Sequence, residues 1–268
     1  MRMRKKKHLD DRLERCAALL EKDPYGQRGR WLERMPEARE LRLEIGCGKG
    51  SFTVKTAQRN PQALFVAVER VADAIVMGME KADEMGVKNV IFVCDDAVRL
   101  SDMFAENEVD LLYINFPDPW PTKKHARRRL TYTDFLVSYR AILKDGGQIH
   151  FKTDNRPLFD FSLTQFPLAG YELSEVTNDL HADDPDVIMT DFEARFSAEG
   201  VKINRCVGTK AALPEKIEQV EQLSLLSYWH EGDRVPHGME RVVEQDQIRR
   251  AAEARKAEKR ARKQRVDG

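Results

Sequence analysis

Acidic side chains stand where three buried strands are expected to end. Glu44 lies beside a glycine-rich turn, and Glu69 follows the glycines by about 20 residues, where a carboxylate can accept hydrogen bonds from both hydroxyls of a ribose. Asp95 and Asp96 follow a third strand, where a carboxylate suits the exocyclic amino group of adenine. These spacings predict a crevice for an adenosine at the carboxyl ends of neighbouring strands.

The glycine turn indicates which adenosine cofactor fits. Gly46, Gly48 and Gly50 follow a G-x-G-x-G pattern, whereas the dinucleotide fingerprint G-x-G-x-x-G needs a glycine where Ser51 stands. A carboxylate at Glu44, beside the turn, repels a pyrophosphate and suits an ammonium group. S-adenosyl-L-methionine carries an ammonium and a sulfonium but no phosphate, so the pattern favours it. A tight turn without a ligand, and acids that only form ion pairs, stay open as alternatives.

A second cluster follows another strand, at residues 115–120. Pro117 and Pro119 restrict the backbone around Asp118 and hold its carboxylate at the mouth of the crevice. Trp120 offers a ring on which a base can stack. A basic block follows that can bind phosphates, unless it is only a solvated loop. Its residues are Lys123, Lys124, His125, Arg127, Arg128 and Arg129.

Buried strands must alternate with helices from residue 41 onward to position these groups. That alternation predicts an α/β fold with a mostly parallel seven-stranded sheet, helices on both faces and an antiparallel last strand at one edge. The predicted strands are residues 41–45, 63–68, 90–94, 109–115, 148–153, 171–177 and 201–208. The predicted helices are residues 9–22, the segment after the glycine turn, 71–85, 97–105, 132–143, 155–166, 190–199 and 217–228.

Charge patterning divides the chain of 268 residues, although Lys and Arg balance Asp and Glu overall. The basic stretch 2–7 is either a solvated tail or a nucleic-acid arm. The segment from Met239 onward, which contains a further basic block over 249–265, is either a solvated helix or a disordered basic tail. We expect a basic arm with a short helix over 1–40, an S-adenosylmethionine-dependent domain over 41–210, and a helical, basic extension over 211–268.

Several classes of protein are disfavoured. The four cysteines are scattered and form no C-x-x-C pair, so we expect neither a metal site nor a disulfide framework. No apolar run approaches the roughly 20 residues that span a bilayer, and no apolar segment of a secretory signal follows the basic N-terminus. We therefore expect a cytoplasmic protein with no membrane partner. The sequence leaves open whether it is a monomer or a homodimer.

Seven stretches together resemble the bacterial tRNA (guanine-N7)-methyltransferase family over about residues 40–210. The glycine turn is common to many methyltransferases, whereas Pro-Asp-Pro-Trp and Thr-x-Phe-Glu are far more selective. The resemblance implies a Rossmann-like class I methyltransferase that uses S-adenosyl-L-methionine to methylate N7 of guanosine 46 in the variable loop of tRNA. The matching stretches are residues 43–50, 68–70, 95–97, 116–120, 127–131, 152–154 and 190–193.

Roles carried over from the family fall on the same positions. The resemblance implies that Asp118 is catalytic and that it contacts the cofactor together with Glu44, Glu69 and Asp96. The family usually has a lysine four residues after the catalytic aspartate, where this chain has Thr122. We expect the neighbouring Lys123 to replace it. The implied substrate-binding residues are Asp154, Thr190, Asp191, Phe192 and Glu193.

Three other functions remain as alternatives. A nicotinamide-dependent oxidoreductase lacks both the third glycine and an obvious hydride-transfer site. A non-catalytic RNA-binding protein would not need the acids at Glu44, Glu69 and Asp118. Methylation of an exocyclic amine is also compatible with an acid and an aromatic residue after the fourth strand, and only the family resemblance favours guanine N7 over it.

Overall fold

An eight-stranded sheet organises the computed structural model, which describes residues 7–220 and 222–266, with side chains up to residue 258. The strand order is β1-β4-β3-β2-β5-β6-β8-β7; the pairs from β1 to β6 are parallel, and β8 is antiparallel to both neighbours. The strands are β1 (Leu20–Glu21), β2 (Glu40–Ile45), β3 (Ala63–Glu69), β4 (Val90–Cys94), β5 (Val109–Asn115), β6 (Leu143–Thr153), β7 (Tyr171–Thr177) and β8 (Asn204–Lys210).

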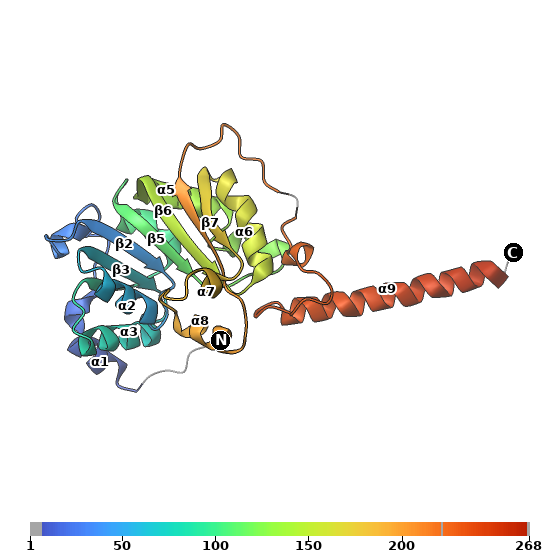
Figure 1. The fold of residues 1–268 in the computed structure, drawn as a ribbon, viewed down its shortest axis with the longest axis horizontal. Helices are drawn as coiled ribbons and strands as arrows, with labels where there is room; N and C mark the ends of the chain where they lie inside the picture. Colours follow the sequence, from blue (N-terminus) through green and yellow to red (C-terminus); the bar gives the residue numbers. More distant parts are fainter. Residues whose placement is uncertain (1–6, 221, 267–268) are drawn as a thin grey trace.

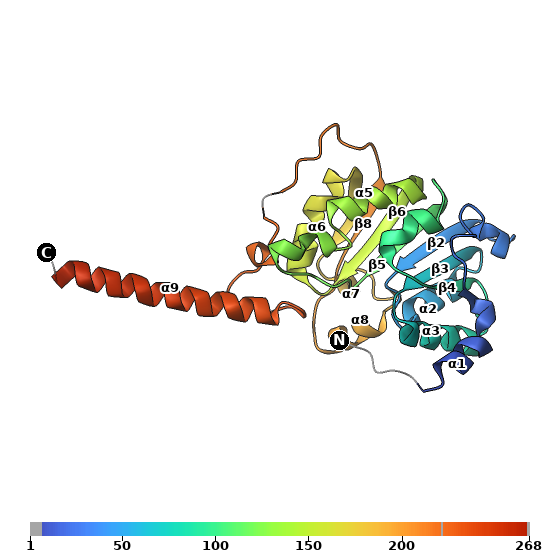
Figure 2. The same cartoon turned by 180° about the vertical axis from the view of Figure 1, so that it is seen from behind.

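Helices cover both faces of the sheet, as Figures 1 and 2 show from opposite sides. Alternate residues of β3 separate the two faces, because Phe65 packs in a core with α2 and α3, whereas Val66 packs in a core with α4, α5 and α6. The apolar run of the strand is therefore buried on both sides. The helices are α1 (Leu9–Arg15), α2 (Ser51–Arg59), α3 (Ala72–Glu84), α4 (Leu100–Met103), α5 (Thr133–Ile142), α6 (Arg156–Leu168), α7 (Leu180–Asp183), α8 (Asp191–Ala198) and α9 (Glu240–Val266).

The chain reverses its direction of winding between β2 and β5. β2 pairs with β3 on one side and with β5 on the other, so the segments that follow β2 and β5 leave the sheet side by side. Open α/β sheets bind ligands at such a switch point, at the carboxyl ends of the strands. This topology brings the glycine turn next to the loop that carries Asp118.

The first 40 residues differ from the prediction. The helix expected over 9–22 ends at Arg15, and after a 3₁₀ turn (Ala17–Leu19) the chain forms β1, which pairs with β4. Trp31 then begins a second 3₁₀ turn (Trp31–Arg34); its side chain is fully buried, and its indole N–H donates to the Met103 carbonyl at 2.9 Å. The backbone of β4 offers an open edge, and pairing with it overrides the local helical pattern. The basic stretch 2–6 lies outside the described residues.

The predicted position of the last strand is also wrong. β8 is antiparallel, as expected, but it lies between β6 and β7, so β7 forms the edge of the sheet. Burial explains the order, because Cys206 and Val207 of β8 are fully buried, whereas the middle of β7 is mostly exposed. A strand with polar, exposed residues suits an edge better than one with a buried centre.

The first helix that we expected after residue 210, over 217–228, does not form an α-helix in its described part. Within the described part of 217–228, only a 3₁₀ turn (Leu225–Tyr228) forms. The backbone there bonds to the domain instead, since the Leu225 N–H donates to the Pro121 carbonyl at 2.9 Å. The basic tail, by contrast, is helical within the described residues: α9 runs away from the domain as a long rod (Figure 1).

We expect His150 of β6 to make the fold sensitive to acid. Burial lowers the pKa of His150 to about 3, with smaller contributions from Arg205, Arg42 and Lys152. Between pH 6.5 and about 3 the unfolded chain binds this proton and the folded chain does not, so His150 contributes a loss of stability as the pH falls through that window. In thermal melts from pH 7 to 4.5, His150→Gln should lose fewer degrees of Tm than the wild type. Parallel curves would contradict this.

Candidate active site

The glycine turn after β2 leaves its backbone open to a ligand. Gly46 and Gly48 have φ of 72° and 54°, in the left-handed region that favours glycine, and a Cβ on either would meet no atom within 4 Å. The Gly46 N–H donates to the Val68 carbonyl at 2.8 Å, which ties the turn to the end of β3. A ligand can therefore approach the backbone at these two positions.

Gly50 has a different function in the turn. It has φ of 67°, and a Cβ there would lie 2.8 Å from the Cα of Gly78 and 3.0 Å from the ring of Phe92. Gly50 therefore allows the start of α2 to pack closely against α3 and β4. This is the packing function that the third glycine of a dinucleotide fingerprint provides one residue later in the sequence.

Glu44 is buried near the carboxyl end of β2. Its carboxylate accepts hydrogen bonds from the Thr53 hydroxyl and, at 2.8 Å, from the Asn115 side-chain amide. Burial raises the pKa of Glu44, and these two hydrogen bonds oppose that effect. The sequence analysis gave no role to Thr53 of α2 or Asn115 of β5, which fix the carboxylate between these two elements. Each is a polar residue in a buried stretch, Thr53 near the start of α2 and Asn115 at the end of β5, and this is the signal that could have found them.

The other predicted cofactor acids stabilise the backbone at the glycine turn and after β3 and β4. Glu69 accepts from the Gly48 N–H at 3.2 Å and from the Val71 N–H at 3.0 Å, so it links the end of β3 to the glycine turn. Asp96 accepts from the Val98 N–H at 3.1 Å and pairs with Arg70 at 3.3 Å. The structure thus brings Glu44, Glu69 and Asp96 to the carboxyl ends of the neighbouring strands β2, β3 and β4, as predicted.

The loop that carries Asp118 has a strained backbone. Phe116 and Trp120, on either side of the Pro-Asp-Pro sequence, have φ of 51° and 43°. Large side chains rarely adopt this region, which costs about 1–3 kcal/mol per residue and is concentrated at functional sites. Asp118 is exposed, and within the described part of the chain its carboxylate has no hydrogen bond or ion pair. The loop therefore presents a free carboxylate.

Arg129 does not lie where the sequence analysis placed it. It was predicted to bind phosphate, but its side chain is fully buried and covers the ring of Phe161, 4.3 Å from the ring centroid. The guanidinium donates to the Pro119 carbonyl at 3.0 Å and to the Trp120 carbonyl at 2.9 Å. Arg129 therefore supports the Asp118 loop from inside the protein and is not accessible to phosphate in this structure.

The remaining cations of the basic block are exposed beside the loop. They belong to a 3₁₀ segment (Lys123–Arg128) that begins after Thr122, whose hydroxyl lies 3.1 Å from Nδ1 of His125. Arg128 covers the ring of Trp120 at 4.9 Å, and His125 contacts the same ring edge-on. A base that stacks on Trp120 must therefore share or displace these contacts. The exposed cations are Lys123, Lys124, Arg127 and Arg128.

The Thr-x-Phe-Glu stretch forms the start of α8. Thr190 is the N-cap: its hydroxyl accepts from the Glu193 N–H at 3.0 Å, and the Glu193 carboxylate accepts from the Thr190 N–H at 3.1 Å. Glu193 is fully buried, whereas Asp191 and Phe192 are exposed. The stretch therefore combines two residues that build the helix end with two that face outward.

Lys152 connects this helix end to α2, and the sequence analysis did not select it as a site residue. Its ammonium lies 2.7 Å from the Glu193 carboxylate and 4.9 Å from the centroid of the Phe52 ring, and both partners of the pair are buried. Burial lowers the pKa of Lys152, while Glu193 and Glu44 raise it. A lysine within the buried strand β6 is the sequence signal for such a group.

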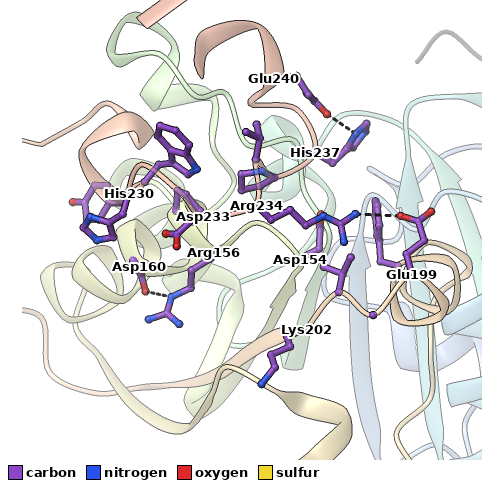
Figure 3. A pocket seen from close by; sticks show the side chains of 18 of the residues that line it. Asp154, Arg156, Asp160, Glu199, Lys202, His230, Asp233, Arg234, His237 and Glu240 are labelled. Carbon is purple, nitrogen blue, oxygen red and sulfur yellow. Dashed lines mark hydrogen bonds and ion pairs between the residues drawn. The ribbon is translucent and has the colours of Figure 1, made fainter. Parts of the chain in front are cut away.

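Asp154 follows β6 and lines a pocket between the domain and the extension. Burial raises the pKa of Asp154. Figure 3 shows Arg234 reaching past it toward Glu199, where the two charged groups lie 3.2 Å apart. The other walls come from the starts of α6 and α9, the end of α8 and residues 228–237. Because β5 pairs with β6, Asp118 and Asp154 follow neighbouring strands.

No helix in 7–220 or 222–266 is long and apolar enough to cross a membrane. In the same part of the chain, no group of three or more His, Cys, Asp or Glu side chains is arranged to hold a metal ion.

Solved structures share this fold. A 16S rRNA (adenine(1408)-N(1))-methyltransferase from Catenulisporales acidiphilia superposes with a TM-score of 0.52 at 15% identity, covering 72% of this chain and 96% of that one. The 16S rRNA methyltransferase KamB gives a TM-score of 0.51 at 15% identity, covering 66% and 90%. At such low identity the likeness concerns the fold alone. The chain therefore has the Rossmann-like fold of these proteins, with an open glycine turn and acids at the carboxyl ends of its parallel strands.

Sequence comparisons give the family. The model of a family described as putative methyltransferases matches residues 38–206. A tRNA (guanine-N(7)-)-methyltransferase from Brevibacillus brevis is 41% identical over 185 residues, covering 68% of this chain and 86% of that protein. One from Halalkalibacterium halodurans is 41% identical over 207 residues, covering 77% and 94%. The chain belongs to the tRNA (guanine-N7)-methyltransferase family.

Proposed function

We propose that this protein transfers a methyl group from S-adenosyl-L-methionine to N7 of guanosine 46 in the variable loop of tRNA. One observation carries the proposal: the free carboxylate of Asp118 lies on a strained loop beside the open glycine turn, with four exposed cations next to it. The names of the relatives support the guanine N7 of tRNA as the target. The choice of nucleotide 46 rests on the family resemblance.

The residues present fit the cofactor. Gly46 and Gly48 leave room for it on the backbone, and the Glu44 carboxylate suits its ammonium group. Glu69 and Asp96 lie at the ends of β3 and just after β4, where they would accept hydrogen bonds from the ribose and the adenine. S-adenosyl-L-methionine supplies an electrophilic methyl group on a sulfonium.

Guanine N7 already has a free lone pair, so the reaction needs no strong base. The protein must orient the base toward the methyl group, and well-oriented reactants can gain about 7–11 kcal/mol from positioning alone. The guanine becomes positively charged as the bond forms. Asp118 would orient the base and stabilise that charge with its unpaired carboxylate. Asp154 would accept hydrogen bonds from the donor edge of the guanine.

Cleavage chemistry tests the proposal directly. Unmodified tRNA transcript is incubated with labelled S-adenosyl-L-methionine and treated with borohydride and aniline, which cut at N7-methylguanosine. A single cut in the variable loop would support both the reaction and the nucleotide. Label transfer without a cut would favour an exocyclic amine. Cofactor binding without transfer would favour a non-catalytic RNA-binding protein.

We expect tRNA binding to depend steeply on salt. Each phosphate contact at Lys123, Lys124, Arg127 and Arg128 should contribute about 0.7–0.9 to the slope of log K against log salt. Replacing all four by alanine should therefore flatten the slope by about 3 to 4 and weaken binding at low salt. Arg39→Ala with Lys88→Ala is the matched control, because both side chains are exposed at the amino ends of β2 and β4. Equal slopes in all three proteins would refute the phosphate role.

The same titration tests the distal part of α9, which is rich in Lys and Arg. We propose that it adds contacts to RNA. The deletion should remove residues 254–268 only, because Met239 and Val243 at the start of the helix are buried in the domain. Unchanged affinity and slope would leave the distal helix without a role in binding.

Since tRNA is the proposed substrate, we also propose that the protein acts in the cytoplasm as a monomer or homodimer.

A further inference from the structure

Part of the C-terminal extension packs directly against the Asp118 loop. We call residues 223–225 and 237–239 the C-terminal brace. Leu225 and Met239 of the brace are fully buried in the same core as α5 and α6. The brace therefore belongs to the folded domain, unlike residues 247–258 of α9, which are exposed along the rod that leaves it (Figure 2).

Arg129 joins the brace to the loop. Its guanidinium donates to the carbonyls of Pro119 and Trp120, as described above, and also to the Leu223 carbonyl at 2.8 Å. One buried side chain thus holds both segments through their backbones. The positive charge is expensive to bury without a carboxylate, and burial lowers the pKa of Arg129 to about 10. The three carbonyl dipoles offset this cost in part.

Two further contacts join the loop to the brace, and a third fixes the brace to α6. A Cβ on Gly238 would lie only 2.8 Å from Cγ of Pro119, so the brace backbone touches the loop there. The Leu225 N–H donates to the Pro121 carbonyl at 2.9 Å. The Asn155 side-chain amide donates to the His237 carbonyl at 3.1 Å, which fixes the brace to the start of α6. Contacts therefore reach the loop at three consecutive residues after Asp118.

These contacts explain how the strained loop persists. The positive φ values of Phe116 and Trp120 are unfavourable, and such conformations last only where the surrounding structure imposes them. The Phe116 N–H donates to the Lys152 carbonyl at 2.8 Å, which holds the first end of the loop. The second end, at Trp120, is held by Arg129 and the brace.

We propose that the C-terminal brace is a positioning element of the active site, which holds the loop at 116–121 so that Asp118 is presented to the substrate, and that Arg129 is the positioning residue that ties brace and loop together. The consequence for catalysis rests on the function proposed above. The restraint on the loop does not, and it can be measured without any substrate.

Gly238→Ala tests the brace, and Gly232→Ala is its matched control. Both glycines have positive φ, of 81° and 102°, so alanine strains the backbone at both. Only at Gly238 does the new methyl meet the loop, because nothing lies within 4 Å of a Cβ on Gly232. The first readout is amide hydrogen exchange of the peptide covering 116–124. We expect faster exchange there in Gly238→Ala and exchange as in the wild type in Gly232→Ala.

The second readout is kinetic. Gly238→Ala should lower kcat about 10-fold or more, because small misplacements of a catalytic group are costly, and should leave the Kd of S-adenosyl-L-methionine unchanged. Arg129→Met should change exchange and kcat in the same direction, with partial recovery in Arg129→Lys. Normal exchange and kcat in Gly238→Ala would overturn the proposal, as would equal changes in Gly232→Ala or a parallel loss of cofactor binding. If the wild type transfers no methyl group, the proposed function fails, while hydrogen exchange still decides the brace.

Discussion

Asp118→Ala is expected to lower kcat by about 10²–10³, the usual cost of removing one group that stabilises charge in a transition state. The carboxylate of Asp118 has no hydrogen bond or ion pair in the described structure, so its removal breaks no structural contact. The backbone of the loop is held instead by Arg129 and by the Phe116 N–H. The loss should therefore appear in the methyl-transfer rate and not in stability.

Binding and rate must be measured separately for this variant. Calorimetry gives the Kd of S-adenosyl-L-methionine, and single-turnover transfer to tRNA gives the rate. Asp118→Asn keeps the shape of the side chain but removes its charge, so it should recover little if the charge is what matters. Equal losses in rate and in cofactor affinity would make Asp118 a cofactor ligand only, and a rate in Asp118→Asn equal to wild type would exclude the electrostatic role.

Glu193→Ala is expected to destabilise the protein by about 3–5 kcal/mol, as the loss of one partner from a buried ion pair usually does. Lys152 is 5% exposed in this pair, so without Glu193 its ammonium would remain buried with no carboxylate at that contact. Glu193 also accepts from the Thr190 N–H and lies 3.4 Å from Nε2 of His181. Urea denaturation gives the free energy of unfolding.

A double-mutant cycle separates the pair from these other contacts. Lys152→Met with Glu193→Gln removes both charges and keeps an acceptor at residue 193 for the N-cap. The double variant should lose clearly less stability than the sum of the two single variants. Additive losses would show that the pair contributes no coupling. A second control is Asp191→Ala, which removes an exposed carboxylate from the same helix turn and should keep its stability within about 0.5 kcal/mol.

Local patterns predicted the central elements well. The apolar run of β3 and the glycine turn after β2 define their own structure, because burial on both faces and positive φ restrict the residue types at each position. Parallel strands also bring their carboxyl ends together. The strand ends alone therefore placed Glu44, Glu69, Asp96 and Asp118 beside one another, at the carboxyl end of the sheet.

Long-range contacts account for what the sequence did not predict. Arg129 has the same local pattern as Arg128, yet Arg129 is buried by Phe161 and by Leu223, and Arg128 is exposed. The edge position of β1 likewise depends on β4, about 70 residues away in the chain. Neither neighbour can be recognised from the local pattern. The sequence therefore predicted one solvent-exposed basic block, whereas in the structure Arg129 is buried and the other four Lys and Arg side chains of the block are exposed.

The place of β8 sets an order in which the sheet can be completed during synthesis. β6 and β7 leave the ribosome first, but β7 pairs only with β8 in the described structure, and β6 needs β8 to cover its outer edge. A nascent chain therefore carries an open edge beside Phe151 until β8 has left the ribosome. Unpaired edges of this kind recruit other strands. A ribosome pause before β8 has left the ribosome should thus favour aggregation, whereas a pause after that point should not.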